Sequence, residues 1–494
     1  MIKLANRQGP RRRTLAISLI LATIVTTAFA LRFWGLGGLS LIGDESYYWL
    51  WSRHPAWAYY DHPAGVALLV RASTAIAGST VFGIRWLNAL LGVACVVLMW
   101  RIGELLLSRQ AGLFSAAAVA LGAPFLVISR FVYTDTLTLF AMLLSILASW
   151  RMTRKDAGTV EGLAFGVALA LLLNTKYTAY AFVAALAAGL FLDHRHLLHT
   201  PRLWLAAGIG ALGLLPVLGW NAGHGWASLH WQLAHVTRVA IQDPGMLGSA
   251  YHAWIYLTPP LILMAAAGLG RISTPAERLL TVLSAFLLIP LALSPINSPR
   301  NLITGLAPLL LLAGARLPAS LADGQQRAVA AGAALLLFGV ALFGVGTVVN
   351  LAGPSALPHS SIVPAIRRDA AGWQELGALL ERGSEPVFAL DYSIAAQIRY
   401  YADRPAFTAW GQYRLWGIPP FQDATIVALD YLDPDIVTRR LREAFRDVEG
   451  PDRLTFTEPG VTKVVHTWSA RGLRWDQETF LQRFDFLTMI QGVH

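Results

Sequence analysis

The sequence contains little cysteine and little charge, and each shortage excludes a class of protein. Cys95 is the single cysteine and lies within an apolar run, so neither an intramolecular disulfide nor a cysteine-based metal site is possible. Charged residues make up 14% of the 494 residues and hydrophobic residues 55%, which is too apolar for a soluble protein of this length. The chain is therefore expected to lie in a membrane, and its chemistry must come from carboxylates, histidine, lysine, arginine or the backbone.

A nucleic-acid-binding module is also lacking, although the formal net charge is +10. Many of the basic residues flank apolar runs, where they orient membrane helices instead of forming a binding face. The sequence shows no internal repeat and no low-complexity tract. The positive charge therefore indicates topology, and no nucleic-acid partner is expected.

About eleven apolar runs are suited to crossing a hydrocarbon core, which takes ~20 residues of helix. They lie at about 14–32, 84–101, 111–129, 134–150, 160–174, 177–192, 203–220, 250–270, 279–294, 301–316 and 328–350. The N-terminus and alternate loops carry sixteen Lys and Arg residues, whereas the opposite short loops carry four. Because cytoplasmic loops are enriched in Lys and Arg, the N-terminus is predicted to be cytoplasmic and the C-terminus to lie outside.

The first apolar run allows two interpretations. Arg11 to Arg13, the apolar stretch and Ala28-Phe29-Ala30 together are typical of a cleaved signal peptide. The stretch is somewhat long for a signal, so an uncleaved helix is favoured. Cleavage would leave the rest of the topology unchanged.

Two segments lie outside the predicted spans. Residues 33–83 form the first outer loop, in which 45–53 and 64–77 are predicted to be amphipathic helices lying along the interface. A transmembrane catalytic domain is predicted at 1–350, followed by a small soluble α/β domain on the outer, periplasmic side at 351–494. In that domain strands are expected at 387–391, 406–410 and 424–431, and a helix at 393–401.

Charged and ionisable residues gather on the predicted outer side. A charged side chain at membrane depth costs at least ~2.5–3.5 kcal/mol on insertion scales, so those that remain suggest a function. Seven residues from five parts of the sequence lie in outer loops or at outer ends of spans: Asp44, Glu45, Asp61, His62, Asp135, Lys176 and Arg300. They predict one cavity that opens outward.

The most informative stretch is GDESYYWLWSR at 43–53, followed by YYDHP at 59–63. Asp44 precedes a helical, aromatic-rich run and is favoured as an N-cap, a position that would also hold its carboxylate rigidly. Tyr47, Tyr48 and Trp51 are favoured as interfacial anchors over a sugar-stacking platform. Asp61-His62-Pro63 fits a turn followed by a helix start.

Asp44-Glu45-x-Tyr-Tyr followed by Tyr-Tyr-Asp61-His62-Pro63 resembles the first outer loop of the GT-C glycosyltransferases, which include the protein O-mannosyltransferases and the lipid A aminoarabinose transferase. Thr134-Asp135-Thr136, Thr175-Lys176-Tyr177 and Trp220-Asn221 follow in the family's order. The resemblance covers about residues 30–315. It implies a GT-C-like polytopic α-helical fold, an undecaprenyl-type polyprenyl-phosphate sugar donor and an inverting transfer on the outer face of a bacterial inner membrane.

The resemblance also implies roles for the outer cluster. An acceptor hydroxyl must lose a proton as it attacks, so Asp44 is the candidate base, with Asp135 and Glu45 as further catalytic candidates. Negative charge grows on the departing phosphate and must meet cations. Lys176 could instead snorkel at a helix end, and Arg300 could be a topogenic residue. The candidate substrate-binding residues are Asp61, His62, Lys176, Tyr177, Arg300, Tyr47 and Tyr60.

A divalent metal is one option, and no other cofactor is expected. Its candidate ligands are Asp44, Asp61 and Asp135, with His224 and His252, although the irregular histidine spacing favours ordinary interfacial histidines. The aminoarabinose transferase has Glu-Lys where this chain has Asp61-His62. The identity of the sugar, and a metal site at that position, therefore do not carry over.

The sequence supports three functions unequally. A transferase acting on lipid A, lipopolysaccharide, another envelope glycan or a protein is favoured. A transporter or flippase of lipid-linked sugars is the main alternative, but transporters place polar residues near the midplane between repeats. A receptor or scaffold would not need carboxylates and cations converging from five segments.

Overall fold

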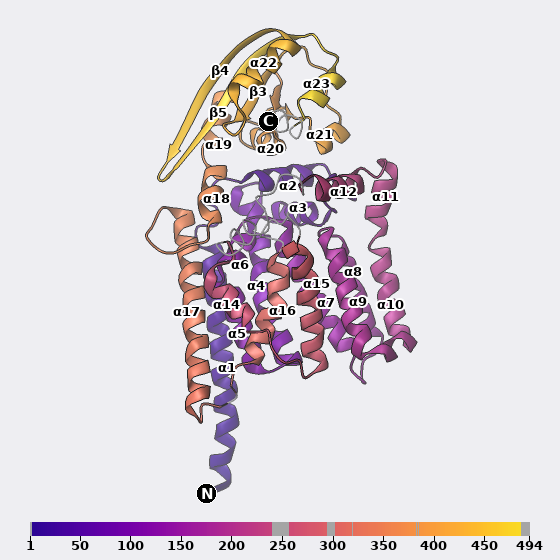
Figure 1. The fold of residues 1–494 in the computed structure, drawn as a ribbon, viewed down its shortest axis with the longest axis vertical. Helices are drawn as coiled ribbons and strands as arrows, with labels where there is room; N and C mark the ends of the chain where they lie inside the picture. Colours follow the sequence, from indigo (N-terminus) through magenta and orange to yellow (C-terminus); the bar gives the residue numbers. More distant parts are fainter. Residues whose placement is uncertain are drawn as a thin grey trace.

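The computed structural model describes residues 2–239, 256–293, 302–318, 320–381, 383 and 385–485. Helices roughly parallel to one another form a bundle, with the N-terminus beyond one end and a sheet-bearing C-terminal region above the other (Figure 1). Helices α2 (Gly43–Arg53), α3 (Gly65–Ala77) and α12 (Ala227–Val239) lie across the bundle end that faces the C-terminal region. Helix α1 and the C-terminal region therefore extend from opposite ends of the bundle.

Five helical segments among the described residues are long and apolar enough to cross a membrane. They are α1 (Ile2–Phe33, apolar from Thr14), α4 (Val81–Leu106), α7 (Thr134–Met152), α10 with α11 (Pro201–Leu212 and Leu215–Gly223) and α17 (Gly324–Ala352). A bent pair, α5 (Arg109–Leu121) and α6 (Ala123–Arg130), gives a sixth. The other bundle helices are α8 (Thr159–Leu173), α9 (Thr178–Asp193), α14 (Pro259–Ala266), α15 (Pro275–Leu293) and α16 (Leu302–Ala315), with a 3-10 turn at Arg195–His199.

The predicted spans coincide with helical segments. One of them is bent, and another is described only in part. The expected span at 111–129 is not one straight helix, because α5 and α6 meet at an angle of 60°. Gly122 between them has extended dihedrals and Pro124 follows, so the helical hydrogen bonds cannot run through this point. Of the expected span at 250–270, residues 250–255 lie outside the described residues. The count of eleven membrane crossings stays a prediction.

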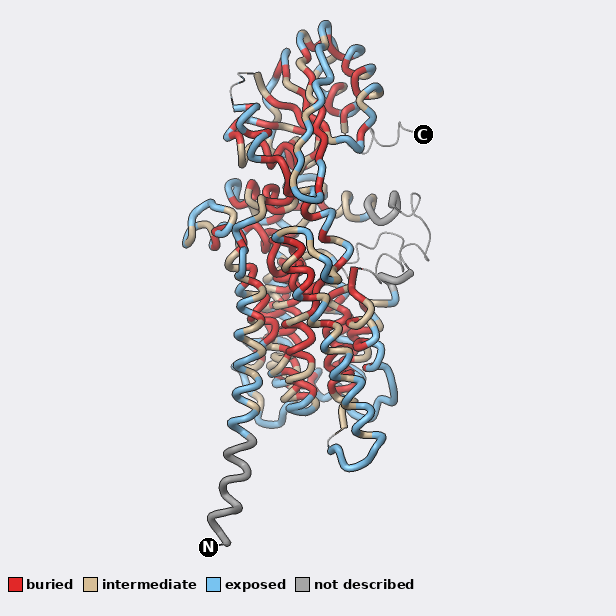
Figure 2. The backbone as a smooth tube through the Cα atoms, turned by 90° about the vertical axis from the view of Figure 1, so that its left-hand side faces the viewer, coloured by how far each residue is buried: buried red, intermediate tan, exposed pale blue. Residues whose placement is uncertain are grey.

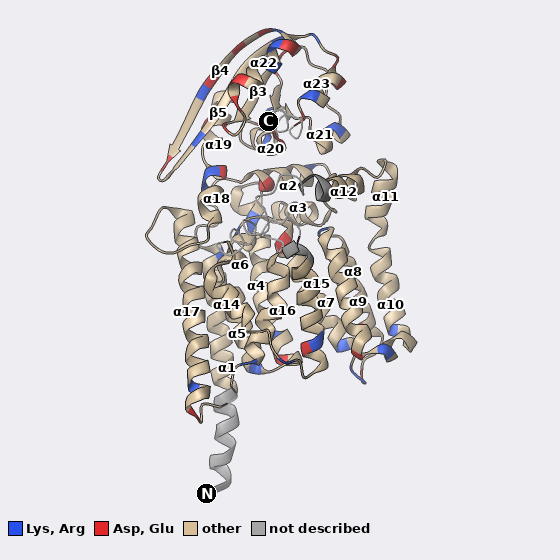
Figure 3. Cartoon of the chain, viewed as in Figure 1, with Lys and Arg blue, Asp and Glu red and all other residues tan. Residues whose placement is uncertain are grey.

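The bundle interior is buried and largely uncharged (Figures 2 and 3). Apolar side chains such as Leu15 and Leu19 on α1 and Leu335 and Phe338 on α17 point outward. Exposed apolar faces of this kind are stable in lipid, which is as apolar as leucine. The composition, the fold and these faces identify the bundle as the membrane part of the chain.

The first outer loop contains the two predicted interfacial helices, α2 (Gly43–Arg53) and α3 (Gly65–Ala77). The backbone N–H of Gly65 donates to the carbonyl of Asn174 at 2.9 Å. A Cβ at Gly65 would lie 2.4 Å from that oxygen, so only glycine permits the approach. The loop is thereby fixed against the turn that carries Lys176.

The C-terminal region contains five strands instead of the three expected. They are β1 (Val387–Ala389), β2 (Ala406–Phe407), β3 (Ala424–Leu429), β4 (Phe445–Glu458) and β5 (Val461–Leu473), in the order β2-β1-β3-β5-β4. The first three strands are parallel, and β5 runs antiparallel to β3 and β4. The helices are α18 (Ile362–Ala370), α19 (Trp373–Leu380), α20 (Tyr392–Tyr401), α21 (Gly411–Trp416), α22 (Pro434–Ala444) and α23 (Gln477–Arg483).

An apolar core joins this region to the first outer loop. Tyr47 and Trp51 of α2 pack in one cluster with Val387 of β1, Ala395 of α20 and Val427 of β3. Burial of such side chains contributes ~1.5–3 kcal/mol each. The C-terminal region therefore packs firmly against the loop that carries the predicted active residues.

Candidate active site

Helix α2 begins with adjacent carboxylates that have different surroundings. The residue before its first turn is Ile42, whose N–H donates to Glu45 Oε2 at 3.1 Å. The interpretation of Asp44 as the N-cap is therefore wrong, because Asp44 already lies in the first turn and Glu45 satisfies the free backbone donor. The aligned N–H groups of that turn still stabilise the negative charge of Asp44.

Glu45 is fully buried in an ion pair that the sequence did not reveal. Its Oε1 accepts from Arg85 Nε at 2.8 Å and its Oε2 from Arg85 Nη2 at 2.6 Å. The N–H of Val132, next to α6, donates to Oε1 at 2.9 Å. With Ile42 included, four donors surround this carboxylate, so it ties the start of α2 to α4 and α6 and is placed to position its neighbour Asp44.

Asp44 points toward the C-terminal region. Its Oδ1 accepts from the hydroxyl of Tyr392, the first residue of α20, at 3.0 Å, and the side chain is half-buried. Gly43, just before it, allows the two segments to meet, since a Cβ there would lie 2.5 Å from Ser393 Cβ. The Asp44 carboxylate is thus held between the membrane part and the C-terminal region, and it stays partly exposed.

Asp61 has a matching arrangement. Its Oδ2 accepts from the Tyr47 hydroxyl at 2.8 Å and from Trp410 Nε1, on the C-terminal region, at 3.4 Å. Removal from solvent raises the pKa of Asp61 to about 7, partly opposed by these two hydrogen bonds, while the negative charge of Asp44 adds to the rise. Asp44 and Asp61 thus each accept a hydrogen bond from a side chain of the C-terminal region, Tyr392 and Trp410.

The aromatic residues of α2 are part of the core. Tyr47 and Trp51 are 2% and 0% exposed, and the Tyr47 ring lies 4.7 Å from the Tyr392 ring and 6.1 Å from that of Tyr413. Tyr48 is also buried. Their interpretation as anchors in the membrane interface is wrong, because the C-terminal region covers them.

Asp135 and Lys176, separated by 41 positions, form an ion pair. Lys176 Nζ lies 3.1 Å from Asp135 Oδ1, and the two side chains are 15% and 5% exposed. Asp135 stands in the first turn of α7 and Lys176 in the turn between α8 and α9. A lysine that simply snorkelled to water would be more exposed, so the pair fixes the ammonium at the bundle end.

The remaining predicted binding residues surround these carboxylates. The Tyr177 hydroxyl and Ser228 Oγ are 2.5 Å apart. The Tyr60 N–H donates to Gln412 Oε1 at 2.7 Å. The His62 ring centroid lies 6.4 Å from that of Tyr48.

The candidate metal ligands are not gathered into one cluster. Among the described residues no group of three or more His, Cys, Asp or Glu side chains could hold a metal ion. His224 is exposed and stacks on Trp220, with ring centroids 4.2 Å apart. His252 and the predicted phosphate-binding Arg300 lie outside the described residues.

Sequence reasoning missed the contribution of the C-terminal region. Tyr392, Trp410 and Gln412 reach Asp44, Asp61 and the backbone of Tyr60 over more than 340 positions. Asp369 Oδ2 accepts from the Gly43 N–H at 3.0 Å, and burial raises the pKa of Asp369 to about 6. Tyr392, Trp410 and Gln412 follow short strands in the C-terminal region. Nothing in the sequence around them indicates that they contact the first outer loop.

Part of the sequence is similar to known proteins. The model of the dolichyl-phosphate-mannose-protein mannosyltransferase family matches residues 61–220. A lipid A galacturonosyltransferase of Rhizobium johnstonii, RgtD, is 28% identical over 183 residues, which are 37% of this chain and 38% of that relative's length. The sequence match thus spans well under half of either protein.

Solved structures match over nearly the whole chain. ArnT from Cupriavidus metallidurans, in the apo state, superposes with a TM-score of 0.61 at 13% identity, covering 92% of this chain and 98% of ArnT. The same protein bound to undecaprenyl phosphate gives 0.59 with 14% identity and the same coverage. The oligosaccharyltransferase AglB from Archaeoglobus fulgidus, in complex with an inhibitory peptide and a dolichol-phosphate, gives 0.57 at 12% identity, covering 84% and 69%. The chain thus has the GT-C fold that its first-loop motifs indicate, and it is similar to the superfamily of protein O-mannosyltransferases and lipid A aminoarabinose transferases.

Proposed function

We propose that the protein is an inverting glycosyltransferase that moves a sugar from a polyprenyl-phosphate carrier to an envelope acceptor on the periplasmic face of the inner membrane. The observation that carries the proposal is the Asp44 carboxylate, half-buried and held by Tyr392 where the first outer loop meets the C-terminal region. Lipid A and lipopolysaccharide are the leading acceptors, since the relative in Rhizobium johnstonii is a lipid A galacturonosyltransferase.

The chemistry needs a base and a cation, and we assign these roles to Asp44 and Lys176. Asp44 accepts the proton of the acceptor hydroxyl as its oxygen attacks the anomeric carbon. The carrier phosphate leaves with growing negative charge, which Lys176 stabilises, and Asp135 keeps the ammonium in place. One attack with one leaving group inverts the anomeric configuration.

One contact joins the loop that contains Asp44 to the turn that carries Lys176, and a second holds Asp61 against α12. Gly65, which follows the Asp61-His62-Pro63 turn, is bonded to Asn174 beside the Lys176 turn. Gln232 of α12 (Ala227–Val239) donates to the Asp61 carbonyl at 2.7 Å. A transfer reaction therefore has its base and its cation on segments fixed to each other.

The test is turnover by the full chain in liposomes that contain a polyprenyl-phosphate sugar and a panel of acceptors. Release of polyprenyl phosphate should require acceptor, and Asp44→Asn should lower it by ~10²–10⁴-fold with the thermal unfolding temperature unchanged. Asp156→Asn, at an exposed carboxylate near the opposite end of the bundle, is the matched control. Normal turnover by Asp44→Asn would show that the base is another residue. Movement of donor across the bilayer without transfer would instead show a flippase.

A further inference from the structure

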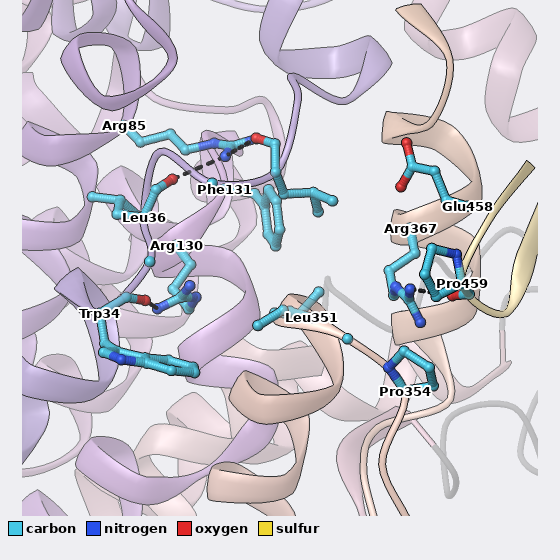
Figure 4. Close-up of a pocket in the computed structure, with 15 residues that line it drawn as sticks. Trp34, Leu36, Arg85, Arg130, Phe131, Leu351, Pro354, Arg367, Glu458 and Pro459 are labelled. Atoms are coloured by element: carbon cyan, nitrogen blue, oxygen red, sulfur yellow. Dashed lines mark hydrogen bonds between the residues drawn. The ribbon is translucent and has the colours of Figure 1, made fainter. Parts of the chain in front are cut away.

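A cavity of about 300 Å³ borders the buried Arg85–Glu45 pair on the side of Arg85. One wall comes from the segment that follows α1 and from α4 and α6, and the other from the end of α17, from α18 and from the tip of the β4–β5 hairpin. Figure 4 shows Arg85, Arg130 and Trp34 on one side and Arg367, Glu458 and Pro459 on the other. Three arginines and one glutamate thus face one space.

The positive charge of this cavity is incompletely balanced. Glu45 neutralises Arg85. Arg130 Nη1 donates to the carbonyls of Leu31, Arg32 and Trp34 at 2.6, 3.2 and 2.9 Å, and no described carboxylate forms an ion pair with it. Carbonyl groups solvate a guanidinium but leave its net charge in place.

Arg130 also has an unused donor. Its side chain is 6% exposed, and its Nε makes no hydrogen bond to any described residue. Arg367 is 8% exposed and donates through Nη2 to the carbonyl of Pro459. The charge of Arg130 is solvated only by backbone carbonyls, so an anion in the cavity would offset it.

The position of the cavity indicates where the anion comes from. Trp34 follows the last turn of α1 and is 55% exposed, and Leu351 stands in the last turn of α17. Both helices present apolar side chains outward along their length, so the cavity lies at the level where their lipid-facing surfaces end. Lipid phosphates lie at that level, with acyl chains alongside the helices.

We infer that this cavity binds the phosphate of a lipid headgroup, with Arg130 and Arg367 as its cationic ligands. Arginine suits this role because its planar fork of N–H donors matches phosphate oxygens. Glu458 faces the same phosphate and lowers its affinity, which sets a limit on how tightly an anion is held. The inference does not depend on the proposed function, because binding is measured without turnover.

Native mass spectrometry of the full chain in neutral detergent tests the inference. Dioleoyl phosphatidic acid is the probe, dioleoylglycerol is the lipid without phosphate, and inorganic phosphate is the anion without acyl chains. We expect phosphatidic acid to bind, dioleoylglycerol to bind at least tenfold more weakly, and inorganic phosphate to compete only weakly.

Three substitutions locate the site. Arg367→Gln should weaken phosphatidic acid binding about tenfold, and Glu458→Gln should strengthen it about threefold to tenfold, because one unit charge near a partly buried anion changes binding by that order. Arg368→Gln, at the exposed arginine next to Arg367 on α18, should leave binding unchanged. The gain in Glu458→Gln cannot arise from misfolding.

Several outcomes would overturn the inference. Equal binding of dioleoylglycerol and phosphatidic acid would show that the cavity does not recognise the phosphate. Inorganic phosphate that binds as tightly as phosphatidic acid would exclude a lipid source. If Arg367→Gln and Arg368→Gln weakened binding equally, or if Glu458→Gln had no effect, the anion would lie elsewhere.

Discussion

The two sides of α2 hold carboxylates with the same chemistry in different surroundings. On the side facing the bundle, Glu45 is buried, paired with Arg85 and bonded to two backbone N–H groups. On the side facing the C-terminal region, Asp44 is half-buried and bonded to Tyr392. The first arrangement fixes a helix, and the second leaves a carboxylate that a substrate can reach. Adjacent positions in a motif therefore divide structure and chemistry between them.

The largest expected effect comes from removing the Glu45 carboxylate, which lies on the side of α2 that faces the bundle. Glu45→Ala leaves the Arg85 guanidinium buried without a counter-charge, so the free energy of unfolding should fall by roughly 3–5 kcal/mol. Thermal unfolding of the purified protein in detergent measures the loss. Asp44→Ala should cost less than ~1 kcal/mol, and replacing the pair by Leu and Met should recover part of the stability. Equal losses for Glu45→Ala and Asp44→Ala would remove the distinction between the two sides.

The next largest effect is expected at the contact between the first outer loop and the C-terminal region. In Gly43→Ala the new Cβ would lie 2.5 Å from Ser393 Cβ, which should cost ~1–3 kcal/mol through displacement of α20. Because α20 carries Tyr392, turnover should fall as well. The double variant Gly43→Ala with Ser393→Gly removes the clashing atom and should restore both unfolding temperature and turnover. A double variant no better than the single one would show that the effect has another cause.

Removing the Tyr392 hydroxyl tests the side of α2 that faces the C-terminal region. Tyr392→Phe removes the hydrogen bond to Asp44, so kcat should fall about tenfold with little change in KM, as the loss of one charge-assisted bond predicts. Tyr400→Phe, which removes a bond to the Ser79 carbonyl in the same interface, is the control and should leave kcat unchanged. Steady-state kinetics at saturating donor separates the two parameters, and equal kcat values for the two variants would contradict the prediction.

The smallest effect is a pH-dependent one at Asp61. Its pKa in the folded chain, about 7, is above the ordinary carboxyl value of 3.8, so the folded state binds the extra proton and loses stability as pH rises from about 4 to about 7. Asp61→Asn removes this loss and should raise the free energy of unfolding by ~1 kcal/mol at pH 8, after allowance for partial exposure, and by nothing at pH 4. Thermal unfolding at the two pH values measures the difference. A gain of the same size at both would show that charge is not its origin.

The membrane fold could be predicted well because its signals are local. Each apolar run is recognisable by itself, and α2 and α3 follow from their own amphipathic patterns. The bend between α5 and α6 was missed because a single glycine inside an apolar run does not interrupt the hydropathy of the run. Strand β4 was missed because its sequence, FRDVEGPDRLTFTE, is mostly polar and exposed, and pairing with β5 stabilises it.

The candidate site could be predicted only in part. The sequence indicated that Asp44, Asp61, Asp135 and Lys176 gather at one end, and the pairing of Asp135 with Lys176 is consistent with that expectation. It could not separate Glu45 from Asp44, because the distinction depends on Arg85, forty positions away. It also gave no indication of the C-terminal side chains that complete the surroundings of both loop carboxylates.

Composition alone determined that this chain lies in a membrane, because 55% hydrophobic residues cannot be covered by 14% charged ones in water. The first-loop motifs indicated a GT-C-like fold through their resemblance to that family, together with three later segments that follow in the family's order. Tertiary structure alone decided which carboxylate is a buried anchor and which faces the C-terminal region. The reason is physical: hydropathy and spacing are properties of neighbouring residues, whereas burial and charge pairing depend on contacts such as Tyr392 with Asp44, which are 348 positions apart.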